Sequence, residues 1–413
     1  MSDRNRANIV LFEDEETAGL NPIALGRPAF ELSCGGYRLV ELAARFGCPL
    51  RAEVRPHLRP LLAAAAPAML ESPPPDSPCV FLHARLAPIA ASLERLRPWI
   101  EAARPFVALR NGAPIAGCLG RAGTWADLGS PGLPAIDFDH PLIEHPHDVI
   151  RFHALALVEN LGDRIARGGY RELAPGVFAA DDVSIHPSAV FDASRGPIVI
   201  EHAATIGPLA VVHGPCRLGP QSVVNDHASL RPGVTAERGC RLGGEVSNSV
   251  LEPFANKQHF GFLGDSYVGA WVNLGAGTTN SNLKNTYGLI TMRYAGRSVP
   301  TDMQFLGTMI GDYAKTAVGT MIYTGKVIGA GSMVYGTVQT NIPSFVNHVP
   351  PPGRPTAIDY QVLAAAQRRM FGRRNQPWTE AHTMVLRAMF DLTAAERVGL
   401  EIAPPDFGPS LYL

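Results

Sequence analysis

The chain has 413 residues, 46% of them hydrophobic and 18% charged, with a formal net charge of −1. A chain of this length exceeds what one hydrophobic core usually supports, so we expect more than one domain. The near-neutral charge gives nucleic acid or an acidic membrane surface no electrostatic attraction, and no apolar run approaches the roughly 20 residues that span a bilayer.

The start of the chain, MSDRNRANIV, lacks the basic stub and apolar run of a secretory signal, and the six scattered cysteines form no C-x-x-C motif. We therefore expect a cytoplasmic protein with free thiols. One group of residues resembles a metal site in composition: Asp137, Asp139, His140, His145 and His147. We interpret this group as a proline-rich loop that enters a helix, and we predict no metal site.

The first part of the chain alternates strand and helix patterns. Short apolar runs predict buried strands at 8–12 and 79–83, and one-sided apolar spacing predicts helices at 36–46 and 147–168. Asn111–Gly112 predicts a tight hairpin. Alternating strands and helices are typical of an α/β sheet. We expect an α/β domain over residues 1–145 and a linker helix within 146–172.

An internal repeat of six residues organises the second half. The aliphatic positions at this spacing are Ile200, Ile206, Val212, Leu218, Val224 and Leu230, and later Ile310, Ile322, Ile328 and Val334. Neither a helix nor an alternating strand has this period, whereas a coil with three flat faces places one inward aliphatic side chain on each face. We expect a left-handed parallel β-helix over residues 173–345, stabilised by the stacking of successive coils.

Two segments interrupt the repeat, 243–262 and 279–305, and we expect both to leave the coil as loops. Beyond the coil, a proline-rich linker and two helices near 358–373 and 379–397 fill residues 346–413. Functional residues commonly lie on such excursions, because a rigid coil positions them.

The segment around His259 supplies the groups that acyl transfer needs. Attack of an amine on a thioester needs a base of near-neutral pKa, and His259 is the candidate. The backbone of Gly275-Ala276-Gly277 can approach a developing oxyanion closely. Asn273 and Asn282 can orient an amino sugar, and Arg231 can bind its phosphate. For the two asparagines, a ladder inside the β-helix is an equally good interpretation.

The run from Ala255 to Gly288, ANKQHFGFLGDSYVGAWVNLGAGTTNSNLKNTYG, resembles the acetyltransferase half of the bifunctional N-acetylglucosamine-1-phosphate uridyltransferase/glucosamine-1-phosphate acetyltransferase. The whole chain is similar to a bacterial branch of sugar nucleotidyltransferases related to that enzyme. The resemblance implies His259 as general base, the Ala276 N–H as oxyanion donor, and Asn273, Asn282 and Arg231 as substrate contacts. It also implies acetyl-CoA as co-substrate and assembly as a homotrimer.

The sequence departs from this family near the expected acceptor. A family tyrosine three residues after the base is Phe262 here, and a family lysine falls near Ser247. Lys257 is a possible replacement for that lysine. The chain has only four lysines, Lys257, Lys284, Lys315 and Lys326, all in the coil. We assign Lys257 and Lys284 to substrate phosphate and Lys315 and Lys326 to coenzyme A, with solvated corner residues as the alternative for the last two.

The N-terminal domain resembles a sugar nucleotidyltransferase without its phosphate loop. The first strand runs into four acids, residues 13–16, which would repel a triphosphate unless Mg²⁺ bridged them. The metal-binding aspartate of a later strand is replaced by His83, while Arg27 takes the place of a substrate lysine and is assigned to substrate binding. We expect a role for Mg²⁺ only if this domain is active.

The sequence therefore favours an acyltransferase of the hexapeptide-repeat class that acts on an amino-sugar phosphate or sugar nucleotide. One alternative is an active sugar-1-phosphate nucleotidyltransferase. A second is a non-catalytic protein that binds sugar nucleotides or serves as a scaffold. In every case the expected partners are small molecules and further copies of the chain.

Overall fold

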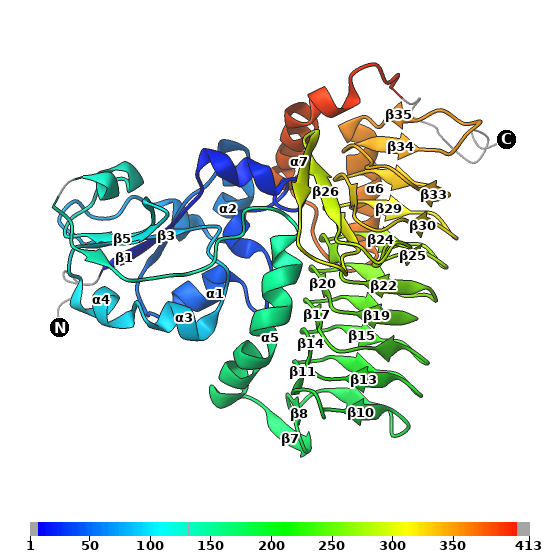
Figure 1. Cartoon of the computed structure of the whole chain (residues 1–413), viewed down its shortest axis with the longest axis horizontal. Coiled ribbons are helices and arrows are strands. Elements are labelled where there is room, and N and C mark those ends of the chain that lie inside the picture. The colour runs from blue at the N-terminus through cyan, green and yellow to red at the C-terminus, as the bar shows by residue number, and fades with distance from the viewer. Residues whose placement is uncertain (1–6, 131, 403–413) are drawn as a thin grey trace.

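The structure is a computed structural model that describes residues 7–130 and 132–402. The first six residues of the predicted α/β domain and the last eleven of the predicted tail lie outside the described residues. An α/β domain stands beside a long β-helix, and the C-terminal helices lie against the later coils of that helix (Figure 1). These three parts confirm the predicted fold class.

The N-terminal domain contains one mixed six-stranded sheet in the order β2-β1-β3-β5-β4-β6. Its strands are β1 (Asn8–Phe12), β2 (Leu50–Glu53), β3 (Cys79–His83), β4 (Phe106–Arg110), β5 (Ala113–Leu119) and β6 (Ala135–Ile136). The central strands β1 and β3 run parallel and are buried along their whole length, which explains why both are continuous apolar runs in the sequence. The carboxyl ends of these two strands therefore lie side by side.

Short helices and one tight turn complete this domain. The helices are α1 (Leu39–Ala44), α2 (Arg59–Ala65), α3 (Ala90–Glu94) and α4 (Arg97–Ala102). The predicted hairpin is confirmed, because β4 and β5 pair antiparallel around Asn111 and Gly112. Both turn residues have positive φ, 50° and 80°, a conformation that asparagine and glycine tolerate best.

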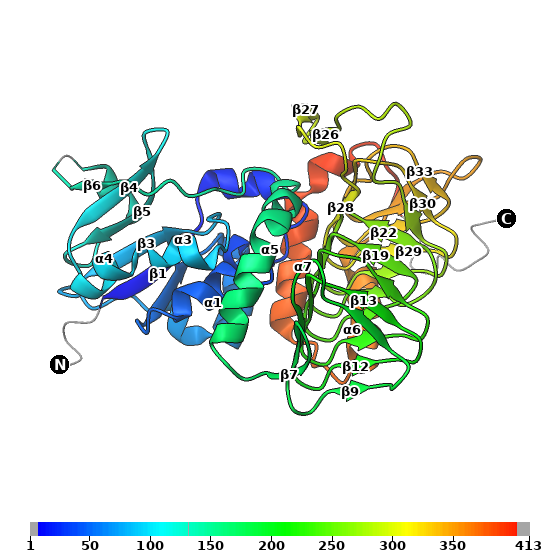
Figure 2. The ribbon, with the colours of Figure 1, turned by 60° about the horizontal axis from the view of Figure 1, so that its bottom comes forward.

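Helix α5 (Asp148–Ala166) confirms the predicted linker helix and packs between the N-terminal sheet and the coil (Figure 2). His153, which is fully buried on this helix, accepts a hydrogen bond from the Gly35 N–H at Nδ1 and donates from Nε2 to the Gly233 carbonyl. Burial lowers the pKa of His153 to about 4, so the neutral ring links the two domains.

The second half is a parallel β-helix with three faces, each a stack of short strands. The first face contains β8 (Val177–Ala179), β11 (Ile198–Ile200), β14 (Cys216–Leu218), β17 (Val234–Ala236), β20 (Ser249–Leu251), β23 (Tyr267–Val268), β28 (Thr308–Ile310) and β31 (Lys326–Ile328), with β7 (Arg171–Ala174) antiparallel at its edge. The second face contains β9 (Ser184–Ile185), β12 (Thr205–Ile206), β15 (Val223–Val224), β18 (Arg241–Leu242), β21 (Asn256–Lys257), β24 (Asn273–Leu274), β29 (Lys315–Thr316), β32 (Met333–Val334), β34 (Val346–His348) and β35 (Thr356–Ala357).

The third face contains β10 (Val190–Asp192), β13 (Val211–His213), β16 (Ser229–Leu230), β19 (Glu245–Ser247) and β22 (Phe262–Gly264), followed by β25 (Thr279–Asn280), β30 (Met321–Ile322) and β33 (Thr337–Val338). This face points away from the N-terminal domain (Figure 1). The predicted inward positions, from Ile200 through Leu230, are at most 1% exposed and form one continuous core. The six-residue repeat is therefore confirmed as the core pattern of the coil.

The two interruptions of the repeat have different causes. Residues 279–305 leave the coil as predicted and form a hairpin of β26 (Thr291–Tyr294) and β27 (Arg297–Pro300). The prediction of a loop over 243–262 is wrong, because β19, β20 and β21 stay in the coil. A regular coil advances by 18 residues, as from Ile198 to Cys216, whereas Val234 pairs with Ser249, a step of 15. The coil here is shortened, which shifts the phase without forming a loop.

The two predicted tail helices are confirmed as α6 (Tyr360–Gly372) and α7 (Glu380–Leu392). They pack on the corner between the first two faces, where Phe254 stacks on Trp271 and Trp271 on Phe371, with ring centroids 4.3 and 3.8 Å apart. Within residues 7–130 and 132–402, no helix is long and apolar enough to cross a membrane.

Candidate functional site

His259 lies at the corner that leads from the second face of the coil to the third. This corner, called the His259 corner here, comprises residues 243–244, 258–261, 275–278 and 317–320 of successive coils. The His259 side chain is exposed, and among the described residues its imidazole has no hydrogen-bonding partner. The base predicted from the sequence is therefore open to solvent and to a substrate.

The next coil places the predicted oxyanion donor beside this histidine. The Gly277 N–H donates to the Phe260 carbonyl at 3.0 Å, which ties the two corner segments together. The Ala276 carbonyl accepts from the Gly319 N–H at 2.7 Å, whereas the Ala276 N–H has no partner among the described residues. A Cβ on Gly277 would lie 3.2 Å from the Phe260 ring, so glycine permits this close approach. Base and free donor thus come from adjacent coils.

Lys257 was predicted to contact substrate, and the structure contradicts this assignment. Its side chain points into the coil, where Nζ donates to the carbonyls of Gly243, His259 and Gly261 at 3.2, 2.8 and 3.0 Å. All three ammonium donors are used, and the residue is 1% exposed. Burial lowers the pKa of Lys257 to about 8. Lys257 therefore holds the backbone on both sides of His259 from the interior of the coil.

Asn273 and Lys315 lie side by side on the second face, since the register of β24 and β29 pairs them. Asn273 accepts a hydrogen bond of 2.7 Å from Asn256, so the ladder interpretation describes this contact. Lys315 donates to the Tyr313 carbonyl at 3.1 Å, and burial lowers its pKa to about 7. Because burial disfavours the ammonium form, Lys315 is less suited to a phosphate than an exposed lysine would be.

The other predicted contacts gather at the opposite edge of the third face. This edge, called the Asn282 corner here, comprises residues 231–233, 247–248, 264–266, 281–284 and 323–326. Arg231 pairs with Glu245 at 3.2 Å and is half exposed, while Lys284 donates to the Leu289 carbonyl at 2.8 Å. Lys326 donates to the Thr324 carbonyl at 3.1 Å and also lines a cavity of about 590 Å³ with Arg293.

Asp265 is the residue of this corner that sequence reasoning missed. Its carboxylate accepts 2.6 Å hydrogen bonds from Asn248 on one side and Asn282 on the other. Burial raises the pKa of Asp265, and the two amides oppose that rise. The three residues recur at steps of 17 in the sequence, Asn248, Asp265 and Asn282, and this spacing was the signal that could have revealed the stack.

One chain therefore does not bring all the predicted residues together. The His259 corner and the Asn282 corner are separated by the third face, whose strand β22 has three residues. Such a strand spans about 10 Å. Within a single chain, the base and the amide-rich corner are thus on opposite edges of one face.

The strand ends of the N-terminal sheet are closed by the side chains of the domain itself. Asp14 accepts from His83 Nε2 at 2.9 Å and from Arg85 at 3.2 Å. Burial pushes the pKa of Asp14 upward, but the hydrogen bond from His83 and the charge of Arg85 hold it well below its usual range. Trp125 stacks on Phe12 beside them, with ring centroids 3.6 Å apart. No phosphate-binding loop follows β1, in agreement with the sequence.

Arg27 was predicted to bind a substrate phosphate, and the structure contradicts this assignment as well. Its guanidinium donates to Glu252 at 2.7 Å and to both oxygens of Asp312 at 2.7 and 3.2 Å. Both carboxylates belong to the coil and are buried. A phosphate at Arg27 would have to displace two acids, so we interpret this arginine as part of the interface between the domains.

The grouped acids and histidines near residue 140 do not form a metal site. His140 contacts Ser92 through Nδ1 and the Ala87 carbonyl through Nε2, both at 2.7 Å. His147 contacts the Tyr294 hydroxyl at 3.1 Å. In the part of the chain that the structure describes, no three side chains of His, Cys, Asp or Glu are grouped as metal ligands would be.

The described chain thus combines an α/β sheet whose strand ends are occupied by side chains of the same domain with a β-helix that carries an exposed histidine. Residues 9–164 match the family model described as sugar nucleotidyl transferase. The chain is 30% identical over 185 residues to the bifunctional protein GlmU of Nitratidesulfovibrio vulgaris, a match that covers 38% of each chain. With GlmU of Acidovorax ebreus it is 28% identical over 291 residues, 64% of this chain and 55% of the relative.

Part of the chain is thus similar to the bifunctional GlmU proteins, and its N-terminal part matches a sugar nucleotidyl transferase model. The matches span about a third to a half of the length of these relatives. Among solved structures, the UDP-N-acetylglucosamine acyltransferase of Campylobacter jejuni matches 54% of this chain and all of its own, at 13% identity and a TM-score of 0.25. The acetyltransferase domain of PglB from Neisseria gonorrhoeae in complex with acetyl coenzyme A matches 81% of this chain and 93% of its own, at 14% identity and a TM-score of 0.20.

Proposed function

We propose that the chain is an acyl-CoA-dependent acyltransferase that acts on the amine of an amino-sugar phosphate or sugar nucleotide. The observation that carries this proposal is the open imidazole of His259 beside the unpaired N–H of Ala276 on the next coil. The relation to bifunctional GlmU proteins supports it. Acetyl-CoA is the expected co-substrate, and the cytoplasm is the expected location.

The reaction follows from the roles of these two groups. The acceptor amine attacks the thioester carbonyl and forms a C–N bond while His259 removes the amine proton. The carbonyl oxygen gains negative charge, which the Ala276 N–H stabilises. When the C–S bond breaks, the electron pair leaves with the thiolate of coenzyme A, and the proton on His259 returns to that sulfur. Lys257 takes no proton in this scheme, because it holds the backbone of the histidine loop.

We further propose that the complete site forms between copies of the chain, in a homotrimer. The two corners that carry the predicted residues lie on opposite edges of the third face, so a neighbouring copy can supply the missing corner. Along this face, Phe260, Val318, Met321 and Tyr323 are 72, 76, 59 and 51% exposed. Exposed apolar side chains on successive coils are typical of a surface that another subunit covers. Asn282, Lys284, Arg231 and Lys326 would then contact substrate or coenzyme A across the interface.

The first experiment is release of free coenzyme A from acetyl-CoA with a panel of amino-sugar phosphates, for the wild type and His259→Ala. We expect turnover with one acceptor and a loss of about 100-fold or more in kcat for the variant. The exposed Gln221 of an earlier coil supplies a matched control, Gln221→Ala. No turnover with any acceptor by a folded wild type, or full activity of His259→Ala, would overturn the proposal.

The assembly is tested separately by light scattering. We expect a mass of three chains of 44.2 kDa, and we expect Val318→Asp with Met321→Asp to give a monomer that keeps its fold but loses acyl transfer. A wild-type monomer with full activity would contradict the shared site.

The family match of residues 9–164 favours one second candidate, nucleotidyl transfer by the N-terminal domain. The ion pairs at Asp14 and the missing phosphate loop oppose it. Pyrophosphate release from a nucleoside triphosphate, a sugar-1-phosphate and Mg²⁺ would establish this activity, and we expect none. A protein without either activity would be the binding or scaffold protein that the sequence left open.

A further inference from the structure

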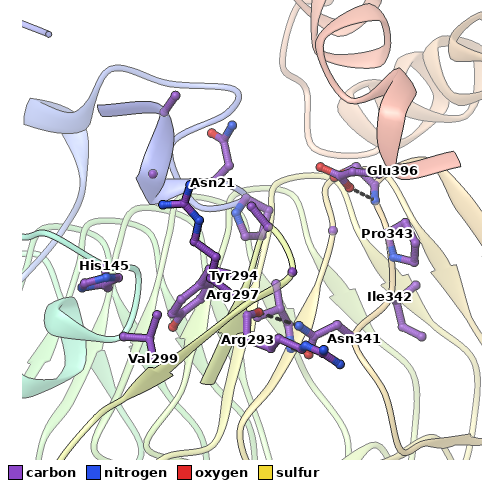
Figure 3. A pocket seen from close by; sticks show the side chains of 18 of the residues that line it. Asn21, His145, Arg293, Tyr294, Arg297, Val299, Asn341, Ile342, Pro343 and Glu396 are labelled. Carbon is purple, nitrogen blue, oxygen red and sulfur yellow. Dashed lines mark hydrogen bonds between the residues drawn. The ribbon is translucent and has the colours of Figure 1, made fainter. Parts of the chain in front are cut away.

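One cavity lies between the two domains and shares no lining residue with the His259 corner or the Asn282 corner. It has a volume of about 730 Å³. Its walls come from four parts of the chain: the N-terminal domain at 18–22 and 144–145, the hairpin β26–β27, the late coils at 327–344, and Glu396 of the C-terminal tail (Figure 3). Small-molecule sites commonly form at such domain boundaries and at this volume.

The hairpin contributes positive charge that no acid of the described chain neutralises. Arg297 pairs across the hairpin with Tyr294, so the two side chains share the face of the ribbon, and both line the cavity. Arg293 lines this cavity and also the neighbouring one that contains Lys326. Among the described residues, neither guanidinium has an ion pair or a hydrogen bond. Arg293 pairs with Ser298, so its side chain leaves the opposite face of the ribbon, and the Arg297 guanidinium is the group on the Tyr294 face that is suited to an anion, above all a phosphate.

The acids of the cavity wall are engaged elsewhere. Glu144 pairs with Arg110 at 2.8 Å, and Glu396 accepts a hydrogen bond of 2.7 Å from the Ser344 N–H. His145 lies 3.7 Å from Asp148. The arginines are therefore the charged groups of this wall that have no partner of their own.

A second polar group in the cavity also has no partner. The side-chain oxygen of Asn21 is buried and accepts no hydrogen bond from the described residues, and Asn21 lines the wall opposite the hairpin (Figure 3). A buried oxygen without a donor costs free energy unless a ligand or water supplies one. Apolar side chains, among them Pro22, Val299, Val327 and Ile342, line the rest.

We propose that this cavity binds a small phosphate ester of a hydroxylated molecule, a sugar phosphate being the simplest member of that class. The phosphate would lie against Arg297, a hydroxyl would donate to Asn21, and the ring would pack on the apolar wall. The occupant contacts the N-terminal domain and the coil at once, so it stabilises their association. This site is separate from the His259 corner, and its existence does not rest on acyl transfer.

The test is calorimetric titration of the full chain with three probes: glucose-1-phosphate, inorganic phosphate and glucose. We expect the wild type to bind glucose-1-phosphate most tightly and glucose not at all. Arg297→Gln should weaken binding of glucose-1-phosphate about tenfold or more, and Arg293→Gln, on the opposite face of the hairpin, should weaken it less. Arg195→Gln is the matched control, because Arg195 is exposed and lies on an early coil. Thermal unfolding of each variant verifies that the fold is retained.

A further variant separates the two halves of the proposed contact. Asn21→Ala should weaken binding of glucose-1-phosphate and leave the affinity for inorganic phosphate unchanged, because inorganic phosphate lacks the sugar hydroxyl that donates to Asn21. If glucose-1-phosphate bound at the acyl-transfer site instead, substitution of Asn282 would weaken its binding and Arg297→Gln would not. No binding by the wild type, or equal affinity of wild type and the Arg293→Gln, Arg297→Gln double variant, would overturn the proposal.

Discussion

The strand ends of the N-terminal sheet and the His259 corner of the coil both carry polar side chains on rigid elements, but the two regions satisfy those groups differently. At the strand ends, Asp14, His83 and Arg85 bond to one another. At the corner, the His259 imidazole and the Ala276 N–H have no partner among the described residues. Catalytic groups must be held in position while their hydrogen-bonding capacity stays free for the substrate. The His259 corner is therefore the better candidate for an active site.

A polar side chain whose hydrogen-bonding partners all lie within the protein stabilises the fold, whereas one without such partners is available to a ligand. The same residue type can take either role. Arg27 and Arg297 are both arginines at the domain boundary. Arg27 is surrounded by two buried carboxylates, whereas Arg297 faces a cavity without an acid of its own. The comparison predicts that substitutions in satisfied clusters lower stability, while substitutions of unpaired groups lower binding or activity.

The largest expected effect on stability is that of Arg27→Met. It leaves Glu252 and Asp312 buried without their cation, which costs about 3–5 kcal/mol in the free energy of unfolding. Urea denaturation measures this loss. The matched control is Arg55→Met, which removes the cation from one buried carboxylate, Glu13, and not from two, so its loss should be smaller. Equal stability of Arg27→Met and the wild type would contradict the structural role of this arginine.

The next effect concerns Lys257→Met, which leaves the carbonyls of Gly243, His259 and Gly261 without their donor. We expect a loss of about 1–3 kcal/mol and lower kcat, because the His259 loop loses its support. The folded-state pKa is lowered to about 8 from 10.5, so the unfolded chain binds more protons between these values. Stability of the wild type should therefore rise relative to the variant as pH increases from 8 toward 10.

Parallel urea titrations of the two proteins at pH 7 and pH 9.5 measure this difference. Lys284→Met is the control, since Lys284 donates a single hydrogen bond to Leu289 and its loop lies at the surface. A stability difference that stayed constant with pH would show that Lys257 titrates normally and that its burial has no energetic consequence.

The early coils were predictable one by one, because the repeat places an aliphatic residue such as Leu218 or Val224 at each inward position, whereas the shortened coil at 243–262 was not, because its step of 15 residues breaks the repeat. The hairpin at Asn111–Gly112 was predictable for a similarly local reason. The roles of Lys257 and Arg27 were not, because the partners of Arg27 lie 225 and 285 residues away and a motif does not show whether a lysine points in or out of a coil. His259 and Ala276 could be identified from the sequence. The exposure of the His259 imidazole, and the lack of a partner for the Ala276 N–H among the described residues, could not.

A smaller effect is expected at the strand ends of the N-terminal sheet. His83 Nδ1 accepts from the Arg85 N–H, so the proton lies on Nε2 and is donated to Asp14. Asp14→Asn weakens this contact and removes the charge that faces Arg85, at a cost of about 1 kcal/mol for a partly exposed carboxylate. The pKa of Asp14 is lowered in the folded state, so its contribution is present above pH 4 and is lost at lower pH.

Thermal unfolding of Asp14→Asn and the wild type at pH 7 and pH 3 measures whether the stabilities of the two proteins become equal at low pH. Asp76→Asn, in an exposed proline-rich loop, is the control that should change neither value. If Asp14→Asn were as stable as the wild type at pH 7 and created magnesium-dependent nucleotide binding, the strand ends would be a ligand site and not a closed cluster.

The smallest effect on stability is expected at Arg231, whose pair with Glu245 is half exposed on both sides. Such pairs contribute less than about 1 kcal/mol, so Arg231→Met should unfold at nearly the wild-type urea concentration. If Arg231 binds the acceptor phosphate from a neighbouring copy, the same variant should raise KM for the phosphorylated acceptor about tenfold with kcat nearly unchanged. Steady-state kinetics with a phosphorylated and an unphosphorylated amino sugar separates the outcomes. A fall in kcat with both acceptors would place Arg231 among the groups that act in the transition state, while unchanged kinetics with both would leave Asn282 and Lys284 as the contacts of that corner.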